Sequence, residues 1–320
     1  MNRRFAIIQA LVSLVALAAV VWWASRQDSP HIPTDGDAIA WLVAAVGLYA
    51  LTTMVRAERW YQILVLASVH ARRADCYALT TVGYMGNNVL PARAGEALRV
   101  VLLAQRSDGS KRTLLGSVVA ERMLDLIALA TIFVVTVYGA LSTSEVLPTD
   151  RPLLVTGTGV ALLVAAAVAV WVLRAHHIFE RARDWLRPLA DAPRALLNRW
   201  GLLLLAVTFV LWSLEATVYL AVARAIDLDF SVSGALYLVA LTNFVAALPA
   251  APGSIGTFDA AVAFGAKALG ASGSAALSYV ILLRFVLYVP ITVFGLVVLV
   301  TRYGGWSRLR SAARLEASRA

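Results

Sequence analysis

The chain has 320 residues, of which 60% are hydrophobic and 15% are charged, and its formal net charge is +9. Soluble domains are roughly 45–50% apolar and about 25% charged, so this composition excludes a water-soluble enzyme, a disordered chain and a fibrous repeat. A single cysteine, Cys76, excludes a disulfide framework and a cysteine-rich metal site. The apolar residues form long blocks rather than an alternating pattern, which predicts an all-α polytopic membrane protein.

Six apolar segments are long enough to cross a bilayer, because a spanning helix needs about 20 mainly apolar residues. The first of them is too long for the apolar core of a signal peptide, which has about 7–15 residues, so we interpret it as an uncleaved span. In chain order the six predicted spans are Phe5–Ala24, Ala38–Val55, Thr113–Leu141, Leu153–Leu173, Gly201–Ala223 and Ala275–Thr301.

The loops between the spans predict their orientation. Segments on the side of Arg3 and Arg4 hold twenty Lys and Arg residues, whereas segments on the other side hold three. Since basic residues gather in cytoplasmic loops, we expect a bacterial inner-membrane protein with both termini in the cytoplasm and a basic cytoplasmic tail, 302–320. The positive charge then follows from topology, and nucleic-acid binding is not needed to explain it. Basic and apolar residues alternate over 175–199, which predicts an amphipathic helix on the inner surface.

Two further apolar stretches, Tyr77–Gln105 and Val232–Leu269, are interrupted by proline and glycine. Proline breaks a helix, and glycine permits turns that other residues avoid. Irregular backbone at membrane depth survives only where protein or water satisfies it. The flanking charges place both ends of the first stretch inside and both ends of the second outside. We therefore predict two re-entrant helical hairpins that enter from opposite faces, with two kinked pairs of full spans as the alternative.

The order of predicted elements repeats: two spans, a hairpin and a span, twice. Each half has an odd number of crossings, so residues 151–301 form a second structural repeat that is inverted relative to residues 1–150. The two repeats belong to a single integral membrane domain, and Leu90-Pro91-Ala92 of the first corresponds to Leu248-Pro249-Ala250 of the second. Inverted repeats with broken helices are typical of transporters, which bind their substrates near the midplane.

Five ionisable residues lie inside predicted spans: Glu121, Arg122, Asp125, Glu215 and Arg284. An ionised side chain at the bilayer centre costs at least ~2.5–3.5 kcal/mol on insertion scales, so we expect these groups to pair in a polar interior. Asp125 follows Arg122 by three residues, within reach of an ion pair, and the spare acid is expected to pair with Arg284 or with an arginine of the first hairpin. Such pairs either hold the spans together or form a charged cavity for an ionic head group.

Polar residues of the hairpins extend the candidate site, because the guanidinium fork of arginine suits phosphate. Arg93 and Arg99 are equally well explained as anchors on the inner side. Glu121, Asp125 and Glu215 are the candidates for balancing charge or carrying protons. The candidates for binding substrate are Asn87, Asn88, Arg93, Glu96, Arg99, Arg122, Asn243, Asp259 and Arg284.

The sequence has no Walker motif, no zinc signature and no Gly-x-Ser-x-Gly elbow. We therefore predict no ATP hydrolysis, no catalytic residue, no metal site and no cofactor in this chain. Protonation of an intramembrane carboxylate is the available route for coupling movement to an energy source.

With these motifs in view, the chain resembles the flippase-like transmembrane region of bacterial lysylphosphatidylglycerol synthases and a related free-standing family of inner-membrane proteins. The resemblance covers nearly the whole chain and rests on Asn87–Arg99, Glu121–Asp125 and Leu248–Asp259, in the family's order. The family often has Glu in place of Asp259 and Gly in place of Ser254. The resemblance implies movement of a phospholipid or lipid-linked head group between leaflets.

The nineteen residues after Thr301 are too few for the soluble aminoacyl-transfer domain of the synthases, so this chain alone is not expected to make aminoacylated lipid. The lipid stays open, and polyprenyl-linked sugars and hopanoid-type lipids are included. Two alternatives to a lipid transporter are a non-transporting partner of a lipid-modifying enzyme or glycosyltransferase, and a membrane-embedded lipid-modifying enzyme. The expected partners are a membrane lipid and such an enzyme, and the sequence is compatible with a homo-oligomer.

Overall fold

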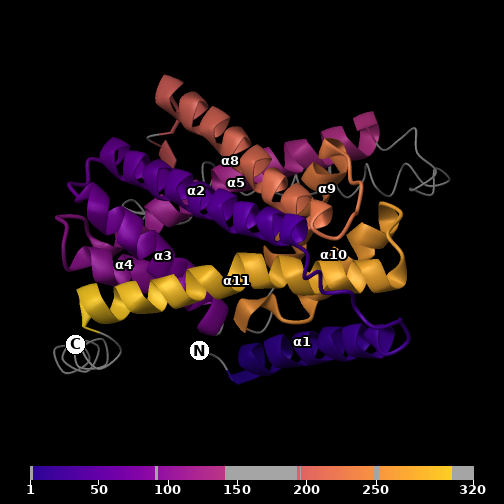
Figure 1. Ribbon diagram of the computed structural model, residues 1–320. Helices are drawn as coiled ribbons and strands as arrows, with labels where there is room; N and C mark the ends of the chain where they lie inside the picture. The colour runs from indigo at the N-terminus through magenta and orange to yellow at the C-terminus, as the bar shows by residue number, and fades with distance from the viewer. Residues whose placement is uncertain (1–2, 91–92, 141–192, 195, 248–251, 305–320) are drawn as a thin grey trace.

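The computed structural model describes residues 3–90, 93–140, 193–194, 196–247 and 252–304. Every regular element in these ranges is a helix, as predicted (Figure 1). The elements are α1 (Arg3–Ala24), α2 (Gly36–Leu66), α3 (Arg73–Val89), α4 (Gly95–Ala104), α5 (Lys111–Val135) with a π-helical end (Thr136–Ala140), α8 (Arg199–Arg224), α9 (Val232–Ala247), a 3-10 turn (Pro252–Ser254), α10 (Thr257–Ala268) and α11 (Gly273–Tyr303).

Three of these helices, α2, α8 and α11, are long and apolar enough to cross a membrane. Helices α1 and α5 occupy two more of the predicted spans, and α5 carries the three charged residues that the sequence placed inside a span. The predicted span Leu153–Leu173 and most of the predicted amphipathic helix 175–199 lie outside the described residues. The inverted repeat therefore stays a prediction.

Helix α2 is longer than predicted, since it continues past Val55 to Leu66. Counting charges along the sequence assigned Arg56 and Arg59 to an inner loop, but both lie in the helix and are buried, with 5% and 1% of their surface exposed. Their guanidinium groups are paired with carboxylates of other helices, which removes the reason for the chain to leave the helix at this point.

Each arm of the two hairpins is shorter than the hydrocarbon core. Arms of 17, 10, 16 and 12 residues extend only about 15–26 Å at 1.5 Å per residue, whereas the core is about 30 Å thick. The arms of the first hairpin, α3 and α4, pack glycine against glycine. A side chain on Gly86 would place its Cβ 2.6 Å from the Cα of Gly95, and a side chain on Gly95 would overlap the carbonyl group of Gly83.

The hairpins lie at opposite ends of α11, and their tips meet near its middle (Figure 1). At the base of the first hairpin, Asp75 accepts hydrogen bonds from Arg302 (2.9 Å) and Tyr303 (3.3 Å) at the end of α11. The second hairpin leads directly into the start of α11. At the tips, Asn88 donates to Thr292 of α11 over 2.9 Å.

Two apolar clusters support the hairpins. The larger joins α8, α9, α10 and α11, and the smaller joins α3 and α4 to α2, α5 and the end of α11. Large apolar side chains are also exposed along the outer face of α11, such as Phe285, Val289, Val293 and Val297. An exposed apolar face of this extent is expected where a helix meets lipid.

Candidate functional site

A cavity of about 90 Å³, partly open to the surroundings, lies where the two hairpin tips meet α2, α8 and α11. Tyr288 is the central residue of α11, and Tyr49 and Glu215 lie within about 5 Å of the centres of α2 and α8, measured along each axis. The cavity therefore sits halfway along the three helices that are able to span a membrane. Its lining consists of Tyr49, Arg56, Tyr84, Asn87, Asn88, Arg93, Glu215, Tyr219, Asn243, Ala246, Gly253, Ser254, Phe258, Leu287 and Tyr288.

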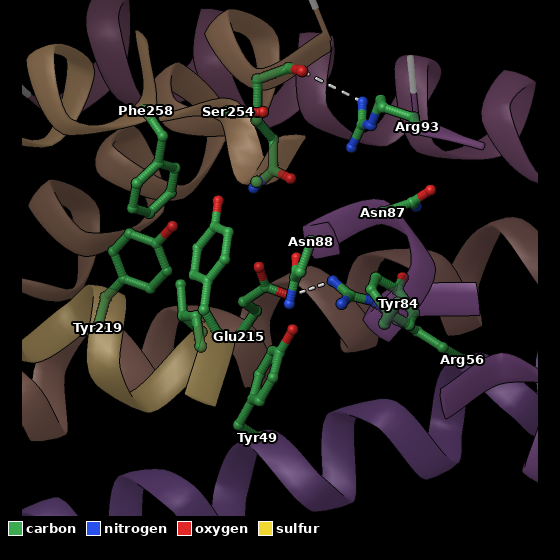
Figure 2. A pocket seen from close by; sticks show the side chains of 15 residues that line it. Tyr49, Arg56, Tyr84, Asn87, Asn88, Arg93, Glu215, Tyr219, Ser254 and Phe258 are labelled. Atoms are coloured by element: carbon green, nitrogen blue, oxygen red, sulfur yellow. Dashed lines mark hydrogen bonds and ion pairs between the residues drawn. The ribbon is translucent and has the colours of Figure 1, made fainter. Parts of the chain in front are cut away.

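One wall of the cavity is a buried ion pair between Arg56 of α2 and Glu215 of α8 (Figure 2). Both side chains have about one twentieth of their surface exposed. The guanidinium group of Arg56 also lies against the rings of Trp212 and Tyr84, 4.9 Å and 5.3 Å from their centres. Because the charges cancel, this pair adds polarity to the cavity without adding net charge.

Arg93 faces the pair from the tip of the first hairpin (Figure 2). Its Nη1 donates to the carbonyl oxygen of Ala246 in the second hairpin, over 3.3 Å. Among the described residues, no carboxylate lies within 4.0 Å of its guanidinium group. The backbone of Arg93 has a φ of 52°, a conformation that non-glycine residues rarely adopt and that recurs at functional sites. Arg93 thus gives the cavity a positive charge that its lining does not balance.

A second group of charges lies outside the cavity, between α2, α4, α5 and α8. At its centre Arg59 donates to Asp125 over 2.7 Å and to Thr208 over 2.9 Å, and it lies 3.5 Å from Glu121. Arg99 of the first hairpin pairs with Glu121 from the other side. All four charged groups are buried.

Arg122 forms the edge of this second group. It lies 3.3 Å from Asp125 on its own helix and 3.7 Å from Glu96 of the first hairpin, and its side chain is 40% exposed. The three arginines of this group, Arg59, Arg99 and Arg122, match the three acids, Glu96, Glu121 and Asp125, in number. The group is therefore electrically balanced, and we name it the balanced charge cluster.

A third pair, Asp259 and Arg284, shapes the tip of the second hairpin. Asp259 accepts from Nε of Arg284 over 2.6 Å and from the backbone N–H of Gly256 over 2.9 Å. Arg284 also donates to the carbonyl oxygen of Gly253 over 3.3 Å. Gly253 and Gly256 have φ values of 65° and 85°, which glycine adopts readily because it has no Cβ. This pair therefore holds the irregular tip against α11.

The structure divides the predicted site residues into three groups. Asn87, Asn88, Arg93, Asn243 and Glu215 share the cavity. The predicted pair of Arg122 and Asp125 is present, and the spare acid, Glu121, is paired with Arg99 of the first hairpin. Asp259 and Arg284 are paired with each other behind the cavity. The balanced charge cluster takes the remaining candidates, Glu96, Glu121, Arg122, Asp125 and Arg99.

Sequence reasoning missed Arg56 and Arg59, and it missed the tyrosines of the cavity wall. The rings of Tyr49 and Tyr84 count as hydrophobic in a sequence pattern, so it does not show that their hydroxyl groups line a polar cavity. A signal for the arginines was available, since the chain from Gly36 to Leu66 has no proline and no break at Arg56. No group of three or more His, Cys, Asp or Glu side chains in the described part of the chain is arranged to hold a metal ion.

Comparison with known proteins finds one matching family and several distant relatives. The family described as the lysylphosphatidylglycerol synthase TM region matches residues 7–295. A UPF0104 membrane protein of Methanothermobacter thermautotrophicus is 22% identical over 314 residues, which cover 90% of this chain and 93% of that protein. The UPF0104 membrane protein PH1989 of Pyrococcus horikoshii is 24% identical over 120 residues, covering 37% of this chain and 36% of PH1989.

A further relative is named as an enzyme. The glycosyltransferase AglD of Haloferax volcanii is 24% identical over 307 residues, which cover 81% of this chain. The match spans 48% of AglD, so this chain corresponds to about half of that protein. No solved structure gives a significant match.

Proposed function

The chain belongs to the family of the lysylphosphatidylglycerol synthase transmembrane region, and from this premise we propose that it is a flippase-like lipid transporter. It moves a phospholipid or lipid-linked head group between the leaflets of the inner membrane, with both termini in the cytoplasm. The two hairpins are re-entrant and enter from opposite faces. We assign this chain no catalytic residue.

The observation that carries the proposal is the polar cavity halfway along α2, α8 and α11. A charged group at the bilayer centre is costly, so a head group that crosses needs a polar enclosure at that depth. The cavity offers amide, hydroxyl and guanidinium groups there, while the apolar outer face of α11 leaves room for acyl chains to stay in lipid.

The contacts between the hairpin tips support an alternating motion. Arg93 holds the second hairpin by one hydrogen bond to Ala246, and Asn88 holds α11 by one hydrogen bond to Thr292. Each is worth only about 0.5–1.5 kcal/mol net, or somewhat more where a charged group takes part. The balanced charge cluster contains several buried ion pairs and stays fixed, so the tips separate and close again around a head group. Protonation of Glu215 would release Arg56 to the cavity and couple this motion to a proton gradient.

A lipid-scrambling assay tests the proposal. The purified protein is reconstituted in liposomes that contain trace amounts of acyl-fluorescent phospholipids, and dithionite reports the fraction that reaches the outer leaflet. We expect loss of fluorescence beyond the outer-leaflet half in wild-type liposomes and a slower rate for Glu215→Gln. The matched control is Asp229→Asn, because Asp229 is 86% exposed and lies in the loop after α8, away from the cavity lining. Failure to move any phospholipid would contradict the proposal.

The relative AglD supports a second candidate, a non-transporting membrane partner of a glycosyltransferase. The part of AglD that this chain does not match makes up about half of that protein, so in AglD the membrane region is joined to another segment. On this candidate, the chain acts as the membrane partner of a separate enzyme. Co-purification of a glycosyltransferase or another lipid-modifying enzyme, together with absence of lipid movement by the chain alone, would favour this candidate.

A further inference from the structure

We propose that the central cavity selects lipids by the charge of the head group: Arg93 binds a phosphodiester, and cationic aminoacyl head groups are disfavoured. The preferred substrate is an anionic phospholipid whose head group is uncharged apart from its phosphate and carries hydroxyl groups, such as glycerol or a sugar. This inference rests on the proposed function, since it names the substrate class of the same cavity.

The charge of the cavity wall comes from three side chains. The ionisable acids and bases in its lining are Arg56, Glu215 and Arg93. Arg56 and Glu215 neutralise each other in a buried pair. Arg93 makes its cavity contact with the neutral carbonyl group of Ala246. The lining therefore carries one net positive charge, which attracts one phosphodiester.

The carboxylates near the cavity are already paired with arginines. Asp259 is engaged by Arg284, and Glu121 and Asp125 are engaged by arginines of the balanced charge cluster. Over the described residues around the cavity, every carboxylate already has an arginine partner. A lysyl or other ammonium group entering the cavity would meet the charge of Arg93 and no carboxylate that is available for it. Removing such a group from water without a partner is costly.

The guanidinium group of Arg93 has donors left over for a ligand. The guanidinium group has five N–H donors, and its hydrogen bond to Ala246 uses Nη1. The other two nitrogens remain for a phosphate, whose oxygens accept parallel hydrogen bonds from the fork. The residue is exposed at the cavity and lies directly before α4, where Gly95 brings the backbone close to α3.

The rest of the polar lining is made of neutral side chains. Tyr49 of α2, Tyr84 and Asn88 of α3 and Asn243 of α9 add hydroxyl and amide groups from three different helices, and Figure 2 shows Tyr49 and Asn88 directed toward the same space. Such groups both donate and accept hydrogen bonds, so they match the hydroxyl groups of glycerol or a sugar. The cavity is thus arranged for one anion and several neutral polar groups.

The experiment measures charge selectivity in reconstituted liposomes. Each preparation holds one acyl-fluorescent lipid at the same trace level: phosphatidylglycerol, phosphatidylcholine or lysyl-phosphatidylglycerol. We expect phosphatidylglycerol to move at least about tenfold faster than the lysylated lipid. A difference of this size corresponds to the free energy of one charge-assisted hydrogen bond. Equal rates, or a faster rate for the lysylated lipid, would overturn the inference and leave the proposed function standing. If none of the three lipids moves, the proposed function itself fails.

Variants of Arg93 connect the selectivity to this residue. Arg93→Ala is expected to slow phosphatidylglycerol about tenfold or more, Arg93→Lys to keep part of the rate, and Arg93→Glu to reverse the order of the anionic and lysylated lipids. The matched control is Arg72→Ala, because Arg72 is an exposed arginine at the base of the same hairpin and does not line the cavity. Unchanged selectivity in Arg93→Glu, with a normal elution volume and helical content, would refute the role of Arg93. Added glycerophosphate should leave the rates unchanged, and strong inhibition would point instead to a soluble phosphate as the ligand.

Discussion

Arg56 of α2 and Glu215 of α8 form a buried ion pair in the wall of the central cavity, 159 residues apart in the chain. The pair is a packing contact between two helices that are long and apolar enough to cross a membrane, and it also forms part of the wall of the cavity that we propose as the head-group site. If the proposed transport takes place, stability and transport both depend on these two side chains, and substitutions can separate the two effects.

Breaking this pair on one side should destabilise the protein strongly. Glu215→Ala leaves the guanidinium group of Arg56 buried and uncompensated, which costs about 3–5 kcal/mol. Thermal unfolding in detergent checks this. The control is Arg224→Ala on the same helix, because Arg224 and Asp229 form a pair that is 50% and 86% exposed, and exposed pairs contribute about 0–1 kcal/mol. The double variant Arg56→Met/Glu215→Leu should recover most of the stability, and equal losses in the single and double variants would contradict the interpretation.

The balanced charge cluster should depend on Arg59 more than on Arg122. Arg59→Ala leaves Asp125 and Glu121 without their central partner, whereas Arg122 lies at the edge and is 40% exposed. We expect Arg59→Ala to lower the free energy of unfolding by about 3–5 kcal/mol and Arg122→Ala to lower it by less than half as much. Chemical unfolding in mild detergent measures both. A larger loss for Arg122→Ala would contradict the proposed centre of the cluster.

The first hairpin should not tolerate a side chain at Gly95. A Cβ at this position would overlap the carbonyl group of Gly83, so Gly95→Ala pushes α4 away from α3 and alters the position of Arg93. We expect loss of lipid movement together with a lower melting temperature. The control is Gly47→Ala in α2, where no atom lies within 4 Å of the added Cβ and where alanine favours the helix by roughly 0.5–1 kcal/mol. Normal transport by Gly95→Ala would show that the hairpin arms are free to separate.

Joining the hairpin tip to α11 should stop transport reversibly. The variant Asn88→Cys/Thr292→Cys replaces the hydrogen bond between these side chains by a pair of thiols, and Cys76→Ser removes the native cysteine. Cross-linking with a short thiol-specific reagent that contains a disulfide should block lipid movement, and a reductant should restore it. Each single-cysteine variant treated in the same way serves as the control. Full activity after complete cross-linking would mean that this contact does not open during transport.

The long apolar helices and their interruptions could be predicted from the sequence because run length, proline and glycine act locally. The ends of α8 and α11 lie within two residues of the predicted spans. The position of Arg56 and Arg59 was less clear: the absence of proline up to Leu66 favours a continuous helix, but an arginine after an apolar run also fits an inner loop. Their partners, Glu215 and Asp125, lie far away in the sequence, so only the folded chain shows that the charges are matched.

The types of residue in the candidate site could be predicted from the sequence, but the sequence did not show which of them face the cavity and which pair with one another. The types of residue that bind phosphate were evident from the hairpin sequences, and Arg122 and Asp125 fall three apart on one helix, which made their pairing predictable. Which arginine faces the cavity depends on how the tips turn. The backbone of Arg93 has a positive φ, which nothing in the sequence predicts, whereas Arg284 is held by Asp259 behind the tip.

The contacts of Asp75 attach the first hairpin to α11 at its base. Its base is bonded to the end of α11 by Arg302 and Tyr303, while its tip, with Asn88 and the adjoining Arg93, is held by single hydrogen bonds to Thr292 and Ala246. If the tip moves while these contacts at the base persist, the hairpin pivots about Asp75 and the displacement grows with distance from the base. Measured between successive stages of a transport cycle, the separation from Asp75 to Tyr303 should stay constant while the separation from Asn88 to Thr292 varies most.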